Sequence, residues 1–160
     1  MAPDVHAPKN CSIREFRYAD LPSVSQIATA SAEASQWSPE SYSELAADAR
    51  GLLLVAECGP GVSGFLAARL AADESEILNV AVRADMRRSG IASALLKAAL
   101  KRLRHEGGTA VFLEVRESNA AAIALYKKFG FSAETRRKGY YRDPAEDALC
   151  MMKKLTGDRS

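Results

Sequence analysis

A carboxylate and a phenol stand twelve residues apart in the second half of the chain, where they could carry acid–base chemistry. Glu114 interrupts the apolar strand pattern of residues 111–115, so its side chain must face a cleft, a partner or solvent. Tyr126 lies in a helix expected over residues 120–129, and Asn119 can cap the start of that helix. A strand-borne carboxylate and a helix-borne phenol can converge at the carboxyl ends of strands, where open α/β sheets bind ligands. The alternative is a solvent-facing Glu114 and a Tyr126 that fills the core.

A second candidate segment, residues 87–92, joins an expected strand to an expected helix. It reads Arg87, Arg88, Ser89, Gly90, Ile91 and Ala92. The first turn of a helix has unpaired backbone N–H groups and a partial positive charge, so a diphosphate placed here would accept several hydrogen bonds. Gly90 allows close backbone approach, and the two arginines add positive charge. The spacing matches neither the P-loop nor G-x-G-x-x-G, and a plain turn with solvated arginines is the alternative.

Four further residues could complete a site. Glu76, near the start of an expected strand, is a rival base to Glu114 or an ordinary edge charge. Trp37, Tyr140 and Tyr141 are expected in loops, where they could line a pocket for a peptide or cover the core.

The elements that must position these residues follow from hydrophobic periodicity. We expect strands over residues 12–17, 52–56, 62–70, 76–82 and 110–115, another starting at 131–133, and a last one over 148–152. Helices are expected from Asp20, from Ser38, over 91–103 and over 120–129. The strand–helix–strand units of the second half predict parallel neighbours there, and the hairpins predict antiparallel pairs elsewhere. The predicted fold is a mixed α/β sheet with helices on both faces.

Length and composition indicate one globular domain. The chain has 160 residues, and domains run to roughly 100–200 residues. Hydrophobic residues make up 48% and charged residues 26%, which excludes a disordered, collagenous or coiled-coil chain. The net charge of +2 is too even a balance to argue for a nucleic-acid or anionic membrane partner. We expect a flexible arm over residues 1–10, without a secretory signal, one domain over 11–156, and a tail over 157–160.

The cysteines and histidines predict no metal site. The chain has three cysteines, Cys11, Cys58 and Cys150, at long spacing and without a C-x-x-C pair. Neither a zinc site nor a disulfide framework is therefore predicted, and free thiols fit a reducing cytosol. The two histidines, His6 and His105, are too few and too far apart for a His-rich site.

These residues resemble the GCN5-related N-acetyltransferases (GNAT). The Q/R-x-x-G-x-G/A signature of that family matches residues 87–92, preceded by 79–82. The resemblance extends over residues 12–155, and within the family it is closest to the RimI type, the ribosomal-protein-alanine N-acetyltransferases. The stretches that carry this finer resemblance are residues 113–126, 129–131, 137–141 and 146–148.

The resemblance implies a fold, a co-substrate and residue roles. The fold would be a central mixed, mostly antiparallel sheet of about six or seven strands, with about four helices on both faces. Acetyl-CoA would be the donor, with no metal, and backbone amides from Arg87 to Ala92 would hold its pyrophosphate. Glu114 would be the general base and Tyr126 the general acid. The pantetheine arm would lie near Asn119 and along Val80, Ala81 and Val82, and the acceptor would lie near Trp37, Glu76, Tyr140 and Tyr141. One departure is Gln36, where the family often has proline.

The expected reaction is acetyl transfer to the N-terminal α-amine of a protein, with the alanine of a small-subunit ribosomal protein as the implied acceptor. Two alternatives keep the same core: acetylation of a small amine, such as a polyamine or an amino sugar, and acetylation of a protein lysine. A non-catalytic acyl-CoA-binding module is a further alternative. We expect a cytoplasmic monomer or weak dimer that binds a protein N-terminus, without direct contact to nucleic acid or membrane.

Overall fold

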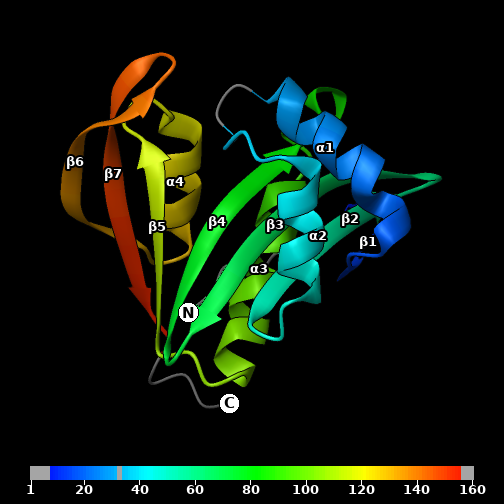
Figure 1. Cartoon of the computed structure of the whole chain (residues 1–160), viewed down its shortest axis with the longest axis horizontal. Helices are drawn as coiled ribbons and strands as arrows, with labels where there is room; N and C mark the ends of the chain where they lie inside the picture. The colour runs from blue at the N-terminus through cyan, green and yellow to red at the C-terminus, as the bar shows by residue number, and fades with distance from the viewer. Residues whose placement is uncertain (1–7, 32–33, 156–160) are drawn as a thin grey trace.

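Seven strands form one sheet in the computed structural model, which describes residues 8–31 and 34–155. The strand order is β1-β2-β3-β4-β5-β7-β6 (Figure 1). The strands are β1 (Cys11–Glu15), β2 (Gly51–Cys58), β3 (Gly61–Ala71), β4 (Glu74–Val82), β5 (Ala110–Arg116), β6 (Ser132–Arg142) and β7 (Ala145–Lys154). Neighbours β4 and β5 are parallel, and the other neighbouring pairs are antiparallel. The expected mixed, mostly antiparallel sheet is confirmed.

One expectation about strand neighbours was wrong. The strand–helix–strand unit that ends in β6 predicted β6 beside β5, but β7 lies between them. β7 turns back from β6 and pairs with both strands, antiparallel in each case. Hydrophobic periodicity reports which residues are buried and not which strand lies alongside, so it could not reveal this insertion.

Four α-helices cover the two faces of the sheet. α1 (Leu21–Ala30) and α2 (Pro39–Ala47) lie on one face, and α3 (Ile91–His105) and α4 (Ala120–Lys128) lie on the other (Figure 1). Helices on both faces are needed to bury the apolar run of β2. Leu52 and Leu54 pack on the α3–α4 side, whereas Leu53 and Val55 pack on the α1–α2 side. A strand buried on both faces reads as a continuous hydrophobic run.

The aromatic pair expected in a loop lies in a strand instead. Tyr140 and Tyr141 belong to β6, whose pairing with β7 shifts register between Arg137 and Tyr141. Gly139, within this bulge, has φ +62°. A glycine beside two polar residues is typical of a turn, but here the bulge absorbs it without ending the strand.

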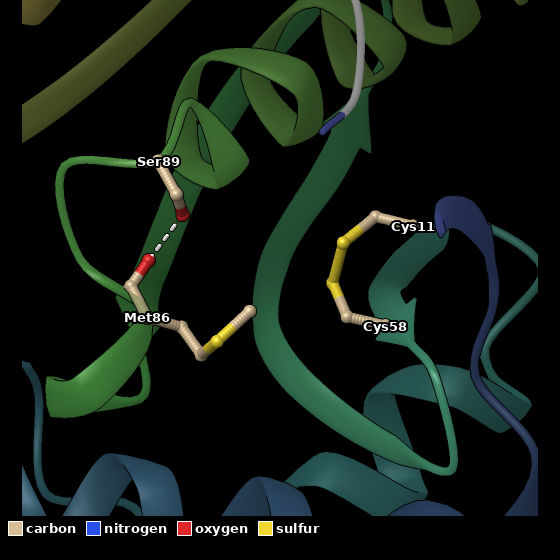
Figure 2. The surroundings of a disulfide bond; sticks show 4 residues. All are labelled: Cys11, Cys58, Met86 and Ser89. Carbon is tan, nitrogen blue, oxygen red and sulfur yellow. Dashed lines mark hydrogen bonds between the residues drawn. A yellow bond between two sulfur atoms is a disulfide. The ribbon is translucent and has the colours of Figure 1, made fainter. Parts of the chain in front are cut away.

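The expectation of free thiols was also wrong, because the structure joins Cys11 and Cys58 in a disulfide (Figure 2). The two residues stand directly opposite each other in the β1–β2 ladder, with their Cα atoms 4.0 Å apart. They are 47 positions apart in sequence, and only the strand register brings them together. Cys150 is a free, half-buried thiol.

The described residues lack the features of two other classes of protein. No helix in residues 8–31 and 34–155 is long and apolar enough to cross a membrane. The same residues contain no group of three or more His, Cys, Asp or Glu side chains placed to hold a metal ion. Most of the expected arm, and all of the expected tail, lie outside the described part of the chain.

Candidate active site

The candidate site is built where β4 and β5 separate. The two strands pair from Glu74 to Ile77 on β4 and from Ala110 to Leu113 on β5, and beyond these residues they diverge (Figure 1). Residues 79–82 of β4 still pair with β3, and the register shifts at Leu78, but the other edge of residues 78–82 has no ladder partner in β5. A cavity of about 470 Å³ lies here, lined by residues 78–82 and 113–116. Unpaired backbone N–H and C=O groups at such an edge can bond an extended ligand.

The turn before α3 closes one end of this cavity. Arg88 and Gly90 both adopt positive φ, +62° and +88°. No side chain caps α3, so its first N–H groups remain for another acceptor. Arg87, Arg88 and Ala92 line the cavity. This arrangement fits a diphosphate, because it combines unpaired amides, a helix N-terminus and positive charge.

The other residues of this segment hold it in place. Ile91 is 1% exposed and packs in the core, so only its backbone is available to a ligand. The Ser89 hydroxyl donates to the Met86 carbonyl oxygen across the turn (Figure 2). Arg87 donates from Nε to the Val82 carbonyl oxygen at 3.2 Å and from Nη2 to Ser31 Oγ at 3.3 Å. These bonds connect the turn to the end of β4 and to the end of α1.

The helix after β5 supplies a capping amide and a phenol. Asn119 Oδ1 accepts from the Ala122 amide at 3.2 Å, which caps α4 as expected, and Asn119 also lines the cavity. Tyr126 lines the same cavity, but its residue is only 8% exposed and its ring packs edge-on against Phe131. Burial raises the pKa of Tyr126 to about 12, with a smaller contribution from Tyr141. The phenol therefore stays protonated at neutral pH and can act as a proton donor.

Glu114 lies where two cavities meet. A second cavity, of about 400 Å³, is lined by Glu76, Phe112, Leu113, Glu114 and other residues, and Leu113 and Glu114 also line the first. Leu113 packs in the core beneath α3 and α4. Glu114 is the next residue of the strand, so its side chain points to the opposite face. A carboxylate in this place can reach a ligand in either cavity.

Glu76 lies on the same face of the sheet as Glu114. Glu76 stands opposite Phe112 in the β4–β5 ladder. Phe112 comes two residues before Glu114 on β5, so its side chain and that of Glu114 share a face of the sheet. Partial burial raises the pKa of Glu76 above its usual value, and the nearby Glu114 acts in the same direction. Glu76 lines the second cavity and not the first, so of the two candidate bases Glu114 is the one placed between both.

The three aromatic candidates lie in different surroundings. Tyr141 lines the first cavity, with the Arg116 guanidinium 4.3 Å from its ring centroid. Burial raises the pKa of Tyr141 to about 12, with Tyr140 and Glu114 adding to the shift. Tyr140 is 45% exposed. Trp37 lies in the loop before α2, and its ring packs on Tyr42 at 5.1 Å between centroids. It is not among the residues that line either cavity.

Sequence reasoning did not single out Asn79, which ties that loop to β4. Its Nδ2 donates to Tyr42 Oη at 2.9 Å and to the Ser35 carbonyl oxygen at 3.0 Å, and its Oδ1 accepts from the Ser35 amide at 3.1 Å. Asn79 is 6% exposed and lines the first cavity. In the sequence, Asn79 could have been recognised as an amide side chain inside an otherwise apolar strand.

Arg137 was also missed as a site residue. Its Nε lies 2.9 Å from Glu114 Oε2, although it comes from the edge strand β6. Arg137 also lines the second cavity. In the sequence it stands in a run of basic residues, Arg136, Arg137 and Lys138, and only the fold shows which of them reaches Glu114.

Known proteins share both this fold and much of this sequence. The sequence profile of the Acetyltransferase (GNAT) family matches residues 21–131. The ribosomal protein bS18-alanine N-acetyltransferase of Salmonella typhimurium is 36% identical over 134 residues, which are 82% of this chain and 89% of that protein. The crystal structure of the ribosomal-protein-S18-alanine N-acetyltransferase from Escherichia coli matches with a TM-score of 0.82 and 31% identity, over 94% of this chain and 97% of that one.

A second solved structure gives the same result. Ard1 from Thermoplasma volcanium matches with a TM-score of 0.84 and 31% identity, over 92% of this chain and 99% of that one. The profile match spans more than half of the chain, and the Escherichia coli structure superposes on 94% of it. The chain therefore belongs to the GNAT family of acetyltransferases.

Proposed function

We propose that the protein transfers the acetyl group of acetyl-CoA to the N-terminal α-amine of a protein, with the alanine terminus of a small-subunit ribosomal protein as acceptor. The observation that carries this proposal is Glu114, which lines both the cavity beside β4 and α3 and the cavity on the opposite face. Relatives from Salmonella typhimurium and Escherichia coli are named as alanine N-acetyltransferases of ribosomal protein S18.

The first cavity suits acetyl-CoA along its whole length. Its pyrophosphate would accept hydrogen bonds from the first turn of α3 and meet the charge of Arg88, which lines that end. The pantetheine arm, an extended chain with amide groups, would run along the free edge of residues 78–82. Asn119, on the far wall, faces the same space. This path would bring the thioester towards Glu114 and Tyr126.

Glu114 would remove the proton that the attacking amine loses, directly or through a water. An N-terminal α-amine has a pKa of about 7.7–8.0, so roughly a tenth is neutral at pH 7. A lysine, at about 10.4, is neutral only at a few parts in ten thousand. An α-amine acceptor therefore needs modest help from a base, and a carboxylate beside the acceptor cavity can supply it.

Tyr126 would return a proton to the departing CoA thiolate. A thiol has a pKa near 8.5, so the phenol is the weaker acid, and its proton would move onto the sulfur as the C–S bond of the tetrahedral intermediate breaks. The tyrosinate would then recover a proton from solvent, and the proton taken up by Glu114 would leave to solvent as well. Tyr126 lines the first cavity only, whereas Glu114 lines both. The acid would thus act on the donor side and the base on the acceptor side, and much of the remaining rate would come from positioning.

The second cavity bears on the small-amine alternative. Its carboxylates, Glu74, Glu76 and Glu114, could favour a polyamine, but two arginines line the same cavity. Arg69 stands opposite Glu76 in the β3–β4 ladder, and Arg137 contacts Glu114. The acidic charge is therefore largely balanced, which favours an acceptor with a single amine. We place this reaction in the cytoplasm and expect a monomer or weak dimer.

The test is thiol release from acetyl-CoA with matched acceptors. We expect release with peptides that begin with free alanine, weaker release with serine or methionine, and none with N-blocked peptides that contain a lysine. Spermidine and an amino sugar serve as small-amine controls. Glu114→Gln should lower kcat while leaving the acetyl-CoA Kd within about twofold, because the carboxylate is assigned to proton transfer. Release with lysine peptides or small amines alone would refute the α-amine assignment and leave the family unchanged.

A further inference from the structure

The side chain of Asn79 binds Ser35, in the segment of residues 34–37 before α2, as a neighbouring strand would. Its Oδ1 accepts from the Ser35 amide at 3.1 Å, and its Nδ2 donates to the Ser35 carbonyl oxygen at 3.0 Å. The other Nδ2 hydrogen goes to Tyr42 Oη at 2.9 Å. One amide side chain therefore supplies the pair of hydrogen bonds that a strand partner would exchange with Ser35.

An irregularity in β4 turns Asn79 towards this segment. Ile77 packs beneath α3 and α4, and by simple alternation Asn79 would face the same side. The pairing of β4 with β3 shifts register at Leu78, and Asn79 instead faces α2, where it meets Tyr42. Asn79 is 6% exposed and Tyr42 is fully buried. Because a buried amide without partners is costly, these bonds strongly favour the observed position of the segment.

The segment held in this way forms one wall of the first cavity. Ala34 and Ser35 line the cavity from the α1–α2 side of the sheet, whereas Tyr126 lines it from the α3–α4 side. The turn assigned to the pyrophosphate leads into α3, so acetyl-CoA would enter from the α3–α4 side. The acceptor amine must then reach the thioester from the other side, where the segment lies and to which Glu114 points.

We propose that Asn79 is a positioning residue for the acceptor: it holds residues 34–37 where they form a wall of the acceptor entrance. This inference rests on the proposed transfer to an N-terminal α-amine. Without the two bonds to Ser35 the segment samples other positions, and the acceptor binds only to the fraction of molecules in which the wall is formed. Each bond contributes about two- to tenfold to that equilibrium.

Asn79→Ala removes the bonds to Ser35 and keeps the backbone edge of β4 that is assigned to the pantetheine arm. At saturating acetyl-CoA we expect the KM of a peptide with a free N-terminal alanine to rise about five- to fiftyfold. The kcat and the acetyl-CoA Kd should stay within about twofold. Trp37 is the only tryptophan of the chain and lies in the segment, so its fluorescence reports the segment without any substrate. Its emission should shift to longer wavelength, and acrylamide should quench it more strongly.

Tyr42→Phe is the matched control, because it removes the bond from Asn79 to the Tyr42 hydroxyl and keeps the ring that packs on Trp37. It should lower the melting temperature and leave the acceptor KM and the Trp37 emission unchanged. Asn79→Asp keeps the size of the side chain, but an ionised carboxylate cannot donate to the Ser35 carbonyl oxygen. It should therefore reproduce the effects of Asn79→Ala, and it replaces that variant if the alanine protein does not fold.

An acceptor KM within twofold of the wild type in the Asn79 variants, or an unchanged Trp37 emission, would overturn this inference alone. A rise in the acetyl-CoA Kd in place of the acceptor KM would also overturn it, because Asn79 would then support the donor. An equal rise in acceptor KM in Tyr42→Phe would do the same, because lost stability would explain both variants. Absence of turnover by the wild-type protein with every free-terminus peptide would overturn the proposed function and this inference with it.

Discussion

A single substitution at Tyr126 can separate the packing of its ring from the proposed role of its hydroxyl in proton transfer. Tyr126 lines the first cavity, and burial raises its pKa to about 12, so the group is a proton donor over the usual assay range. Tyr126→Phe removes the hydroxyl and keeps the ring that packs against Phe131. We expect kcat to fall by about 10²–10⁴-fold, the usual contribution of a general acid, with the acetyl-CoA Kd within about twofold.

Steady-state kinetics and isothermal titration would separate these two effects. Tyr18→Phe is the control, because Tyr18 is 76% exposed and belongs to neither cavity lining, so its loss should change neither constant. An unchanged turnover number in Tyr126→Phe would show that another group protonates the thiolate. A large rise in the acetyl-CoA Kd with unchanged kcat would assign Tyr126 to binding.

At the scale of single elements, the glycines at the two ends of α3 allow a matched comparison of two alanine substitutions. Gly90 precedes its first turn and Gly107 follows its last, with φ +88° and +96°, and a Cβ at either would meet no atom within 4 Å. Alanine at either position should cost about 1–2 kcal/mol of stability through left-handed backbone strain. Only at Gly90 would the new methyl group, and any shift of the turn, disturb the amides assigned to the pyrophosphate.

We therefore expect Gly90→Ala to raise the acetyl-CoA Kd about tenfold or more, as expected for losing one hydrogen bond to a charged group. Gly107→Ala should lower the melting temperature to a similar extent and leave the Kd unchanged. Titration calorimetry and thermal unfolding of both variants provide the comparison. Equal acetyl-CoA Kd values in the two variants would show that the first turn of α3 does not bind acetyl-CoA.

At the scale of the whole molecule, the Cys11–Cys58 disulfide fastens the edge strand β1 to the rest of the sheet. It closes a segment with a sequence separation of 47 residues, which includes α1 and α2. A cross-link of that span stabilises by about 2–4 kcal/mol, mainly by restricting the unfolded chain. Cys11→Ser should therefore lower the melting temperature of oxidised protein by about 5–15 °C.

Thermal unfolding with and without dithiothreitol would test this. Reduced wild-type protein should melt close to Cys11→Ser, and Cys150→Ser, which removes the free thiol, should keep the response to reduction. Identical melting of oxidised wild type and Cys11→Ser would show that the two thiols do not form the bond in solution. That outcome would agree with a reducing cytoplasm, where disulfides are rare.

The sequence by itself determined most of the elements and pointed to many of the residues that line the two cavities. Alternating and helical hydrophobic patterns reflect local geometry, so they located the strands, the helices and the basic turn before α3. Glu114 was conspicuous because a carboxylate departs from the apolar pattern of its strand, and Asn119 because asparagine follows the rule for helix N-caps. The family resemblance then supplied the co-substrate and the roles that remain to be tested.

Only the tertiary structure decided how distant segments meet. The insertion of β7 between β5 and β6, the point where β4 and β5 part, and the pairing of Cys11 with Cys58 all depend on strand order and register. The contact of Arg137 with Glu114 depends on them too, because it crosses an intervening strand. Local patterns record which face of an element is buried, whereas order and register are set by contacts between residues far apart in the chain.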